Sequence, residues 1–201
     1  MPPAMIDDLV RQMNEYATHK MNRTVLKPHS RMKRWPQGGI TRMDFMKFMA
    51  ILISIGMDNK PAIPDYWRVS AQDHQLWYSS VMSRDKFQLM FHTFLHASEP
   101  TAEGKMKIEP FINKLTESFR THFHPFEKLS IDEMVVGFKG RFGSQQYNPK
   151  KPEKYHIKTF GLCDSITGYC LNILTYFGAN TSFRPETDSA GSKAVRVFDK
   201  L

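Results

Sequence analysis

The sequence of 201 residues contains only two cysteines and no long run of apolar residues. Two cysteines are too few for a disulfide framework, so a reducing compartment is expected. The longest apolar run, residues 48–55, is interrupted by Ser54 and is far shorter than a membrane span, which predicts no membrane segment. The N-terminus carries Asp7 and Asp8 and lacks the pattern of a signal peptide, so secretion is not expected.

Acidic residues are also few: 20 Asp and Glu face 28 Lys and Arg, giving a net charge of +8. This excess favours a polyanionic partner such as nucleic acid. The chain has no Ser-His-Asp arrangement, phosphate-binding glycine loop or dinucleotide fingerprint, and we expect no small-molecule substrate. A hydrophobic fraction of 41% with 12% aromatic residues is too high for a disordered chain, so the sequence predicts a folded protein.

The first part of the chain, residues 1–125, has apolar residues at helical spacing. Four helices are expected there. The first is amphipathic and lies near the N-terminus, and a capping box of Thr41 and Asp44 opens the second. Ser83 caps the third, and Pro110 lies at the start of the fourth. This region is therefore predicted to be a helical bundle.

The second part, residues 126–201, has short β-prone runs separated by turn residues. Strands are expected at residues 129–138, 155–163 and 169–177, with a hairpin turn at residues 164–168. Cys163 and Cys170 flank this turn and are predicted to face each other as free thiols. The fold class is therefore predicted to be α+β, with a helical bundle followed by three antiparallel strands.

Asp132 is the candidate site residue within the first expected strand. Strand alternation places its carboxylate on the opposite side from Leu129 and Ile131. A carboxylate there can ligate Mg²⁺, which prefers hard oxygen ligands and takes one or two carboxylates together with substrate phosphates. A solvated strand face explains the same residue, and the spacing alone does not separate the two interpretations.

A basic stretch follows this strand, at residues 139–158, and contains a single acid, Glu153. Lysines that neutralise phosphates and aromatic rings that stack on bases alternate in it, as in nucleic-acid-binding segments. A solvated loop is the alternative. An earlier basic stretch, residues 20–34, contains no acid and is interpreted as a linker, with a DNA-binding arm or a nuclear-import signal as alternatives.

The two blocks at residues 129–141, LSIDEMVVGFKGR, and 148–158, NPKKPEKYHIK, closely resemble piggyBac-type transposases. The motif order extends the resemblance over roughly residues 45–201. The resemblance implies an RNase H-like catalytic domain in which three aspartates bind two metal ions for DNA strand cleavage and transfer. Asp132 matches the first, as a catalytic residue and Mg²⁺ ligand. The other two would lie beyond Leu201, and Asp164 and Asp188 do not match them.

The resemblance therefore implies a truncated transposase-derived protein with an incomplete Mg²⁺ site, inactive on its own. It further implies DNA as a partner, a helical dimerisation and DNA-binding region that allows a homodimer, and a nuclear location. The residues expected to contact DNA are Lys139, Arg141, Lys150, Lys151, Lys154 and Lys158. Two alternatives stay open: a subunit or isoform of an active metal-dependent transposase whose other carboxylates come from a second chain or a longer product, and a non-catalytic protein-interaction module.

Overall fold

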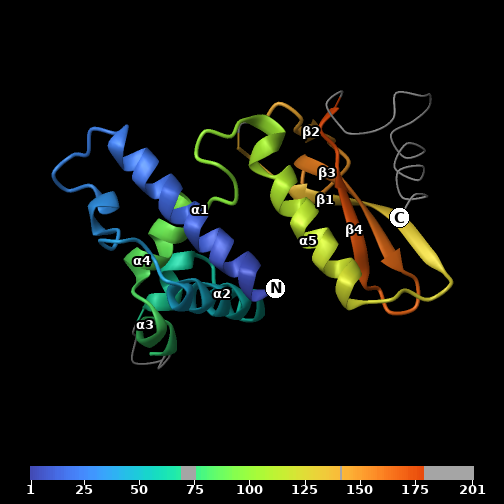
Figure 1. The fold of residues 1–201 in the computed structure, drawn as a ribbon, viewed down its shortest axis with the longest axis horizontal. Helices are drawn as coiled ribbons and strands as arrows, with labels where there is room; N and C mark the ends of the chain where they lie inside the picture. The colour runs from blue at the N-terminus through green and yellow to red at the C-terminus, as the bar shows by residue number, and fades with distance from the viewer. Residues whose placement is uncertain (69–75, 141, 179–201) are drawn as a thin grey trace. The chain divides into compact units, whose positions relative to one another are not determined.

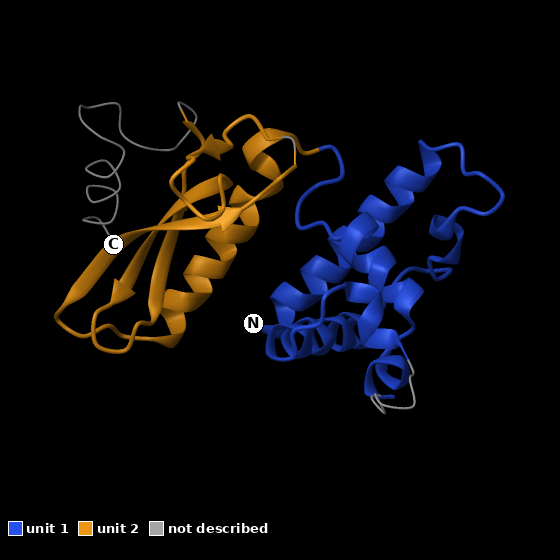
Figure 2. Ribbon diagram, turned by 180° about the vertical axis from the view of Figure 1, so that it is seen from behind, with its two compact units in different colours: residues 1–101 blue, residues 102–201 orange. Residues whose placement is uncertain are grey.

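The computed structural model describes residues 1–68, 76–140 and 142–178 (Figure 1). The chain divides into two compact units, Met1–Thr101 and Ala102–Leu201 (Figure 2). The change in sequence pattern predicts a division at residue 125 instead. The difference concerns helix α5 (Glu109–His122), which packs against strand β4 (Cys170–Thr175) and so lies in the unit that contains the sheet. Within the described ranges no helix has the length and apolarity that a membrane crossing needs.

The first unit is helical, as predicted. Its elements are α1 (Pro3–Asn22), η1 (Arg31–Arg34), α2 (Arg42–Met57), η2 (Ile63–Trp67), α3 (Trp77–Val81), α4 (Arg84–Gln88) and η3 (Leu89–Phe94). The predicted capping box opens α2, because the Thr41 hydroxyl accepts from the Asp44 backbone and the Asp44 carboxylate accepts from the Thr41 backbone. The Lys86 ammonium donates to the same carboxylate over 2.6 Å, which fixes α4 at the beginning of α2.

Aromatic rings fill the core of the first unit. Phe48 of α2, Phe87 of α4 and Phe94 of η3 are fully buried. The ring centroids of Phe48 and Phe87 lie 5.3 Å apart, and Trp35, directly after η1, is buried with its ring centroid 4.5 Å from that of Phe94. The basic segment at residues 20–34, interpreted from sequence as a linker, is therefore anchored in this core through its C-terminal neighbour.

The chain between η1 and α2 is fixed to α1 by Asn14. The Asn14 amide donates to the Ile40 carbonyl over 2.9 Å, and the Ile40 backbone N–H donates back to the Asn14 side chain over 2.8 Å. The backbone of Gly39 lies next to the Asn14 side chain and has a φ of 85°. A Cβ at this position would lie 2.3 Å from the Asn14 oxygen, so both the backbone conformation and the close approach require glycine.

The second unit combines a helix with the antiparallel sheet that the sequence predicts. It contains η4 (Gly104–Lys107), α5, β1 (Leu129–Gly137), β2 (Gln146–Tyr147), β3 (Tyr155–Asp164) and β4. Strand β3 is central, since it pairs antiparallel with β1, β2 and β4. The three long strands correspond to the three that the sequence predicts. The short β2 lies between the first two of these strands, where the sequence predicts a loop.

Helix α5 covers one face of this sheet (Figure 1). The face presents Phe160, Leu162 and Leu171, which are buried. At the end of α5, the ring of Phe123 stacks on that of Tyr169 with centroids 4.3 Å apart. Because strand side chains alternate, residues next to Phe160 and Leu162 along β3 point to the other face.

Cys163 and Cys170 are register partners on β3 and β4, on either side of the hairpin turn, as predicted. Both are free cysteines. Burial, together with the neighbouring Cys163, raises the pKa of the Cys170 thiol to about 11. The Cys170 thiol therefore stays protonated at neutral pH, which makes it a poor nucleophile.

Candidate nucleic-acid interface

The chain between β1 and β3, residues 138–154, is called the basic loop here. Its tip is closed by Asn148, whose backbone N–H donates to the Lys154 carbonyl over 2.9 Å. The Asn148 side chain accepts from the backbone N–H of Lys150 over 3.0 Å, and its carbonyl accepts from that of Lys151 over 3.2 Å. Because these bonds satisfy the backbone within the tip, the tip has a defined shape without contacts from its lysine side chains.

The charged side chains of the basic loop face solvent. Lys139, Lys150 and Lys154 are exposed and Lys151 is half-buried. The sixth position of the predicted set, Arg141, lies outside the described residues. Glu153 is the loop's one acid in the sequence, and one carboxylate cannot match the charges of the four described lysines. This arrangement presents a positive surface to a polyanion.

Two aromatic rings lie beside these lysines. Tyr147 of β2 and Tyr155 of β3 are register partners whose ring centroids lie 4.9 Å apart. The two residues are 59% and 51% exposed. His156, grouped with them in the sequence analysis, is buried instead, with its ring 3.0 Å from the Glu153 carbonyl. The loop therefore offers tyrosine rings, and not the histidine, for stacking on an exposed base.

Lys158 differs from the loop lysines. It lies within β3 and forms an ion pair with Glu133 of β1, with 2.7 Å between the ammonium and the carboxylate. Its ammonium also lies 5.0 Å from the centroid of the Phe160 ring. The Lys158 charge is thus matched by a carboxylate on the sheet, while the loop lysines remain open to solvent.

Asp132 lies on β1 directly opposite Gly161 of β3 and is exposed. Its Oδ1 accepts a hydrogen bond of 2.7 Å from the Glu133 backbone N–H. Glu133 itself is paired with Lys158, and strand alternation directs it to the other face of the sheet. The two neighbouring carboxylates therefore do not converge on one point.

A two-ion site needs several carboxylates that point at the same volume. Within residues 1–68, 76–140 and 142–178, no group of three or more His, Cys, Asp or Glu side chains is arranged to hold a metal ion. The donor set around Asp132 thus does not fit a pair of Mg²⁺ ions in the described part of the chain. Asp188, which does not match a catalytic aspartate of the family by sequence, lies outside the described residues.

Asp164 has a structural environment. Its Oδ1 accepts from the backbone N–H groups of Ile166 and Thr167 over 3.0 and 2.7 Å, and its Oδ2 accepts from that of Phe126 over 2.8 Å. Burial acts to raise the pKa of this carboxyl, but the hydrogen bonds, led by that of Thr167, lower it below its ordinary value. Asp164 closes the β3–β4 turn and fixes the chain that enters β1, and both of its carboxylate oxygens already accept hydrogen bonds from the protein.

A model of the family described as Transposase IS4 matches residues 1–200. Among curated human proteins, PiggyBac transposable element-derived protein 3 is 27% identical over 165 residues, covering 81% of this chain and 28% of the relative. PiggyBac transposable element-derived protein 2 is 26% identical over 172 residues, with the same two shares, 81% and 28%. The chain thus spans little more than a quarter of the length of these relatives.

A solved structure has the same fold. It is a piggyBac transposase in a synaptic complex with hairpin DNA, with a TM-score of 0.79 and 24% sequence identity. The similarity covers 98% of this chain and 40% of the transposase chain. The arrangement of helices followed by an antiparallel sheet is therefore the fold of the corresponding part of that protein.

Proposed function

Since this chain belongs to the piggyBac-type transposase family, we propose that it is a transposase-derived protein that binds DNA through its basic loop. The observation that carries the proposal is the set of four lysines on the basic loop: Lys139, Lys150 and Lys154 are exposed, and Lys151 is half-buried in the closed loop tip. Each lysine that neutralises a phosphate releases a condensed counterion, which favours binding at low salt. Such contacts to the backbone need no particular base sequence.

The tyrosine pair supports contact with unpaired bases beside these phosphates. A base can stack on the open face of Tyr147 or Tyr155, because each ring is more than half exposed. The lysines that precede β3 would contact the DNA backbone on both sides of the stacked base. Arg141, in the same loop, belongs to the proposed set by its place in the sequence.

A DNA titration with the purified chain tests the proposal. Fluorescence anisotropy of a labelled oligonucleotide at about 50 mM and about 200 mM salt should give an affinity that falls steeply with salt. The double variant Lys150→Gln/Lys154→Gln should reduce the slope of log K against log salt by about 2. The matched control Lys107→Gln/Lys128→Gln removes two exposed lysines of the same unit outside the loop and should change the slope by much less. Equal losses in both double variants would contradict a role for the loop.

We propose that Asp132 is a metal ligand in a site that requires further carboxylates. We assign no strand cleavage to the described residues, because their donor set does not fit two metal ions. Magnesium-dependent nicking of DNA by the purified chain, abolished by Asp132→Asn, would contradict this assignment. It would mean that the purified chain completes the site, alone or with a second copy of itself.

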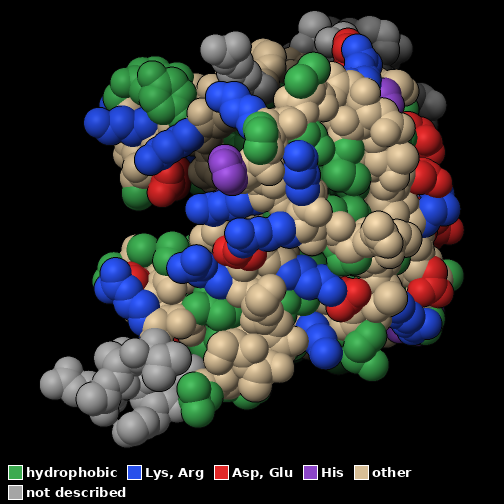
Figure 3. Space-filling view, turned by 90° about the vertical axis from the view of Figure 1, so that its left-hand side faces the viewer, with side chains coloured by type: hydrophobic (Ala, Val, Ile, Leu, Met, Phe, Trp, Pro, Cys, Tyr) green, Lys and Arg blue, Asp and Glu red, His purple; other side chains and the backbone are tan. Residues whose placement is uncertain are grey.

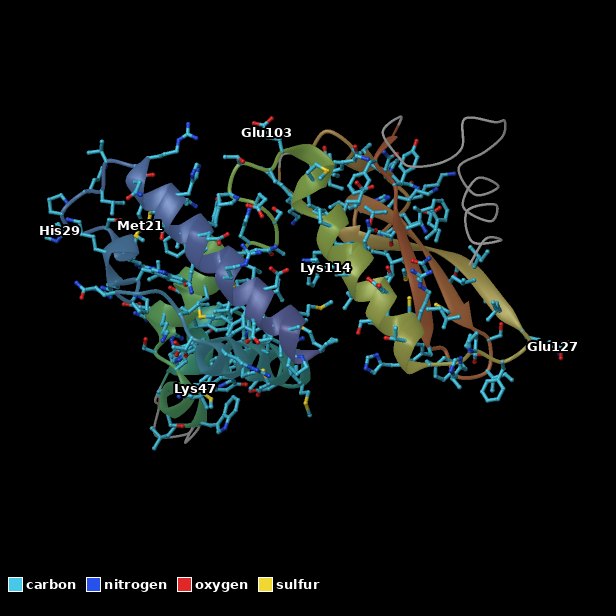
Figure 4. The ribbon with its side chains drawn as sticks, viewed as in Figure 1. Met21, His29, Lys47, Glu103, Lys114 and Glu127 are labelled. Carbon is cyan, nitrogen blue, oxygen red and sulfur yellow. The ribbon has the colours of Figure 1, made fainter. Side chains whose placement is uncertain are left out.

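A homodimer is the proposed assembly, and the exposed side of α2 supports it. Met43, Met46, Ala50, Ile53 and Met57 are all exposed and follow the three-and-four spacing with which paired helices pack. Lys47, labelled in Figure 4, lies in the first half of α2, and the last carbonyls of α2 carry the negative end of the helix dipole. An antiparallel pair of α2 helices would bring these opposite charges together.

Light scattering coupled to size exclusion tests this assembly. Ala50→Lys places a charge at the centre of the exposed side of α2 and should convert a dimer to a monomer. Asn59→Lys, just beyond α2, adds the same charge away from that spacing and should leave the dimer intact. A monomeric wild-type chain would contradict the proposed homodimer.

A nuclear site of action follows from a DNA-binding function. A fluorescently tagged chain expressed in cultured cells should accumulate in the nucleus. Exclusion of the tagged chain from the nucleus would contradict this part of the proposal and would favour a protein-interaction module.

A further inference from the structure

The first unit contains a hollow that the proposed function does not use. It has a volume of about 390 Å³ and lies between the end of α1, η1 and the α4–η3 segment. We call it the α1–η1 pocket. Its polar lining comes from Lys20, Ser30, Arg31, Gln88, His92 and Thr93.

Lys20 is held in place at this pocket. Its ammonium donates to the Thr93 carbonyl over 3.1 Å. It also lies 5.4 Å from the ring centroid of Tyr16 and 5.9 Å from that of Phe94, where the ring faces attract a cation. An ammonium has three donors, and this arrangement specifies the position of its charge while leaving hydrogen-bond capacity for a ligand.

Arg31 is oriented from the other side of the pocket. One guanidinium nitrogen donates to the Gln88 side-chain oxygen over 3.1 Å. Because that oxygen is the acceptor, the Gln88 amide nitrogen remains a donor. The remaining N–H groups of the planar guanidinium form the fork that matches two oxygens of a phosphate.

The lining contains donors and no carboxylate. The nearby acid Asp85 is engaged by Arg34 and lies 3.6 Å from the Arg84 guanidinium, so its charge is already matched. Figure 3 shows Lys and Arg side chains gathered on the side of the molecule that carries η1. The charged side chains of the lining, Lys20 and Arg31, therefore give the pocket a positive field, and its volume has room for a small anion.

We infer that the α1–η1 pocket binds a phosphate group, which accepts hydrogen bonds from Lys20, Arg31 and His92. A phosphate carries negative charge and several acceptor oxygens, which complements a lining of donors. The source of the group is either free phosphate or a phosphate of the DNA backbone. The pocket extends the proposed DNA-binding function to the first unit. It is testable separately, because it shares no residue with the basic loop.

The first experiment uses inorganic phosphate as the probe and the ring signals of His92 in NMR spectra of the full chain as the readout, at constant ionic strength. Saturable shifts of His92, with no comparable shifts of His29, support the pocket. His29 is a suitable reference because it lies in the loop between α1 and η1 and is labelled at the edge of the molecule in Figure 4. Equal, non-saturating shifts of both histidines overturn the inference.

A matched pair of variants identifies the binding group. Arg31→Gln should weaken phosphate binding about tenfold, because it removes charge-assisted hydrogen bonds. Lys33→Gln removes one charge from the same short η1 without lining the pocket, and it should leave the affinity within about twofold. Equal weakening in both variants would mean diffuse attraction and would overturn the inference. Circular dichroism shows whether each variant is folded. His92→Gln and its control His29→Gln repeat the test without changing η1, with the backbone amide signals of Lys20 and Thr93 as the readout in place of the His92 ring.

The second experiment separates the two sources of phosphate. A short DNA duplex is titrated into the Lys150→Gln/Lys154→Gln variant, in which the basic loop is weakened. Shifts of His92 with both DNA and inorganic phosphate assign the pocket to the DNA backbone, and shifts with phosphate alone assign it to free phosphate. If neither DNA nor inorganic phosphate shifts the His92 signals, the inference is overturned. The proposed role of the basic loop is not affected by that result, because the salt titration tests it separately.

Discussion

Strand β3 is connected at its two ends in opposite ways. At its C-terminal end, the carboxylate of Asp164 is directed inward, where it accepts hydrogen bonds from the backbone N–H groups of Ile166, Thr167 and Phe126. The basic loop before it satisfies its own backbone through Asn148 and directs its lysines outward. In the turn the charge of Asp164 stabilises the fold, whereas in the loop the lysine charges remain available to a partner.

The same contrast separates the two aspartates of the sheet. Asp164 is buried and has hydrogen bonds to both carboxylate oxygens, whereas Asp132 is exposed and accepts a bond from its neighbour Glu133. A residue type in a motif therefore does not identify its role. The number of hydrogen bonds that the surrounding backbone directs at the side chain distinguishes a structural carboxylate from one that is open to a ligand.

The largest effect is expected from Asp164→Ala. The substitution leaves the N–H groups of Phe126, Ile166 and Thr167 without their acceptor and loosens both the turn and the entry to β1. We expect the melting temperature of the second unit to fall by more than about 5 °C, measured by circular dichroism. The control Asp132→Ala, on the exposed side of β1, should shift the melting temperature by less than about 2 °C. Comparable losses in the two variants would remove the distinction between the aspartates.

The structural role of the Asp164 carboxylate should also appear in the pH dependence of the melting temperature. The folded-state pKa of Asp164 lies below the unfolded value near 3.8, so the stability that its ionised form contributes is present above that value. It is lost as the pH falls through the lower, folded-state pKa. The difference in melting temperature between wild type and Asp164→Asn should therefore be largest above about pH 5 and shrink at lower pH. A difference that does not change with pH would contradict the role of the ionised carboxylate.

The helices and strands could be predicted from the sequence because their capping and turn residues have the same role in the folded structure that they have locally. The Thr41–Asp44 capping box, the Ser83 cap and Pro110 open helices where predicted. The turn at residues 164–168 was recognisable for the same reason, since its side chains bond to their own backbone. The unit boundary could not be read this way: whether α5 belongs with helices or strands depends on where its apolar side packs.

The candidate site was predictable only in part. Sequence identified the lysines of the basic loop and its tyrosines, but Tyr147 and Tyr155 become neighbours through the short β2, whose two residues have no detectable strand pattern. The pairing of Lys158 with Glu133 depends on the register between β1 and β3. The α1–η1 pocket joins Lys20 and Arg31 to His92, which are far apart in the chain, so only the packing of η1 against η3 reveals it.

Removing one exposed ring should have a smaller effect than unfolding the turn. Tyr147→Ala deletes one of the two tyrosine rings beside the loop lysines, and single-stranded DNA should bind about fivefold to tenfold more weakly, as for the loss of one stacked base. Duplex DNA should be affected less, because its bases are already stacked on one another. Anisotropy titrations with a single strand and its duplex measure the two effects, and Tyr176→Ala, with a half-buried tyrosine just after β4, is the control. Equal losses for both DNA forms would argue against base stacking.

The smallest effect is expected from Lys158→Gln, although this lysine belongs to the same basic stretch as the loop residues. Its charge is paired with Glu133 at 2.7 Å, so it adds little to the field that DNA meets. DNA affinity should change by less than about twofold, and stability by about 1 kcal/mol or less, as for a partly exposed ion pair. Glu133→Gln then provides the informative comparison: it frees the Lys158 charge and should increase DNA affinity and salt dependence if that side of the sheet approaches the backbone. If Lys158→Gln instead weakens binding as strongly as Lys150→Gln, the division between paired and open lysines is wrong, and the DNA-contacting surface extends from the basic loop onto the sheet.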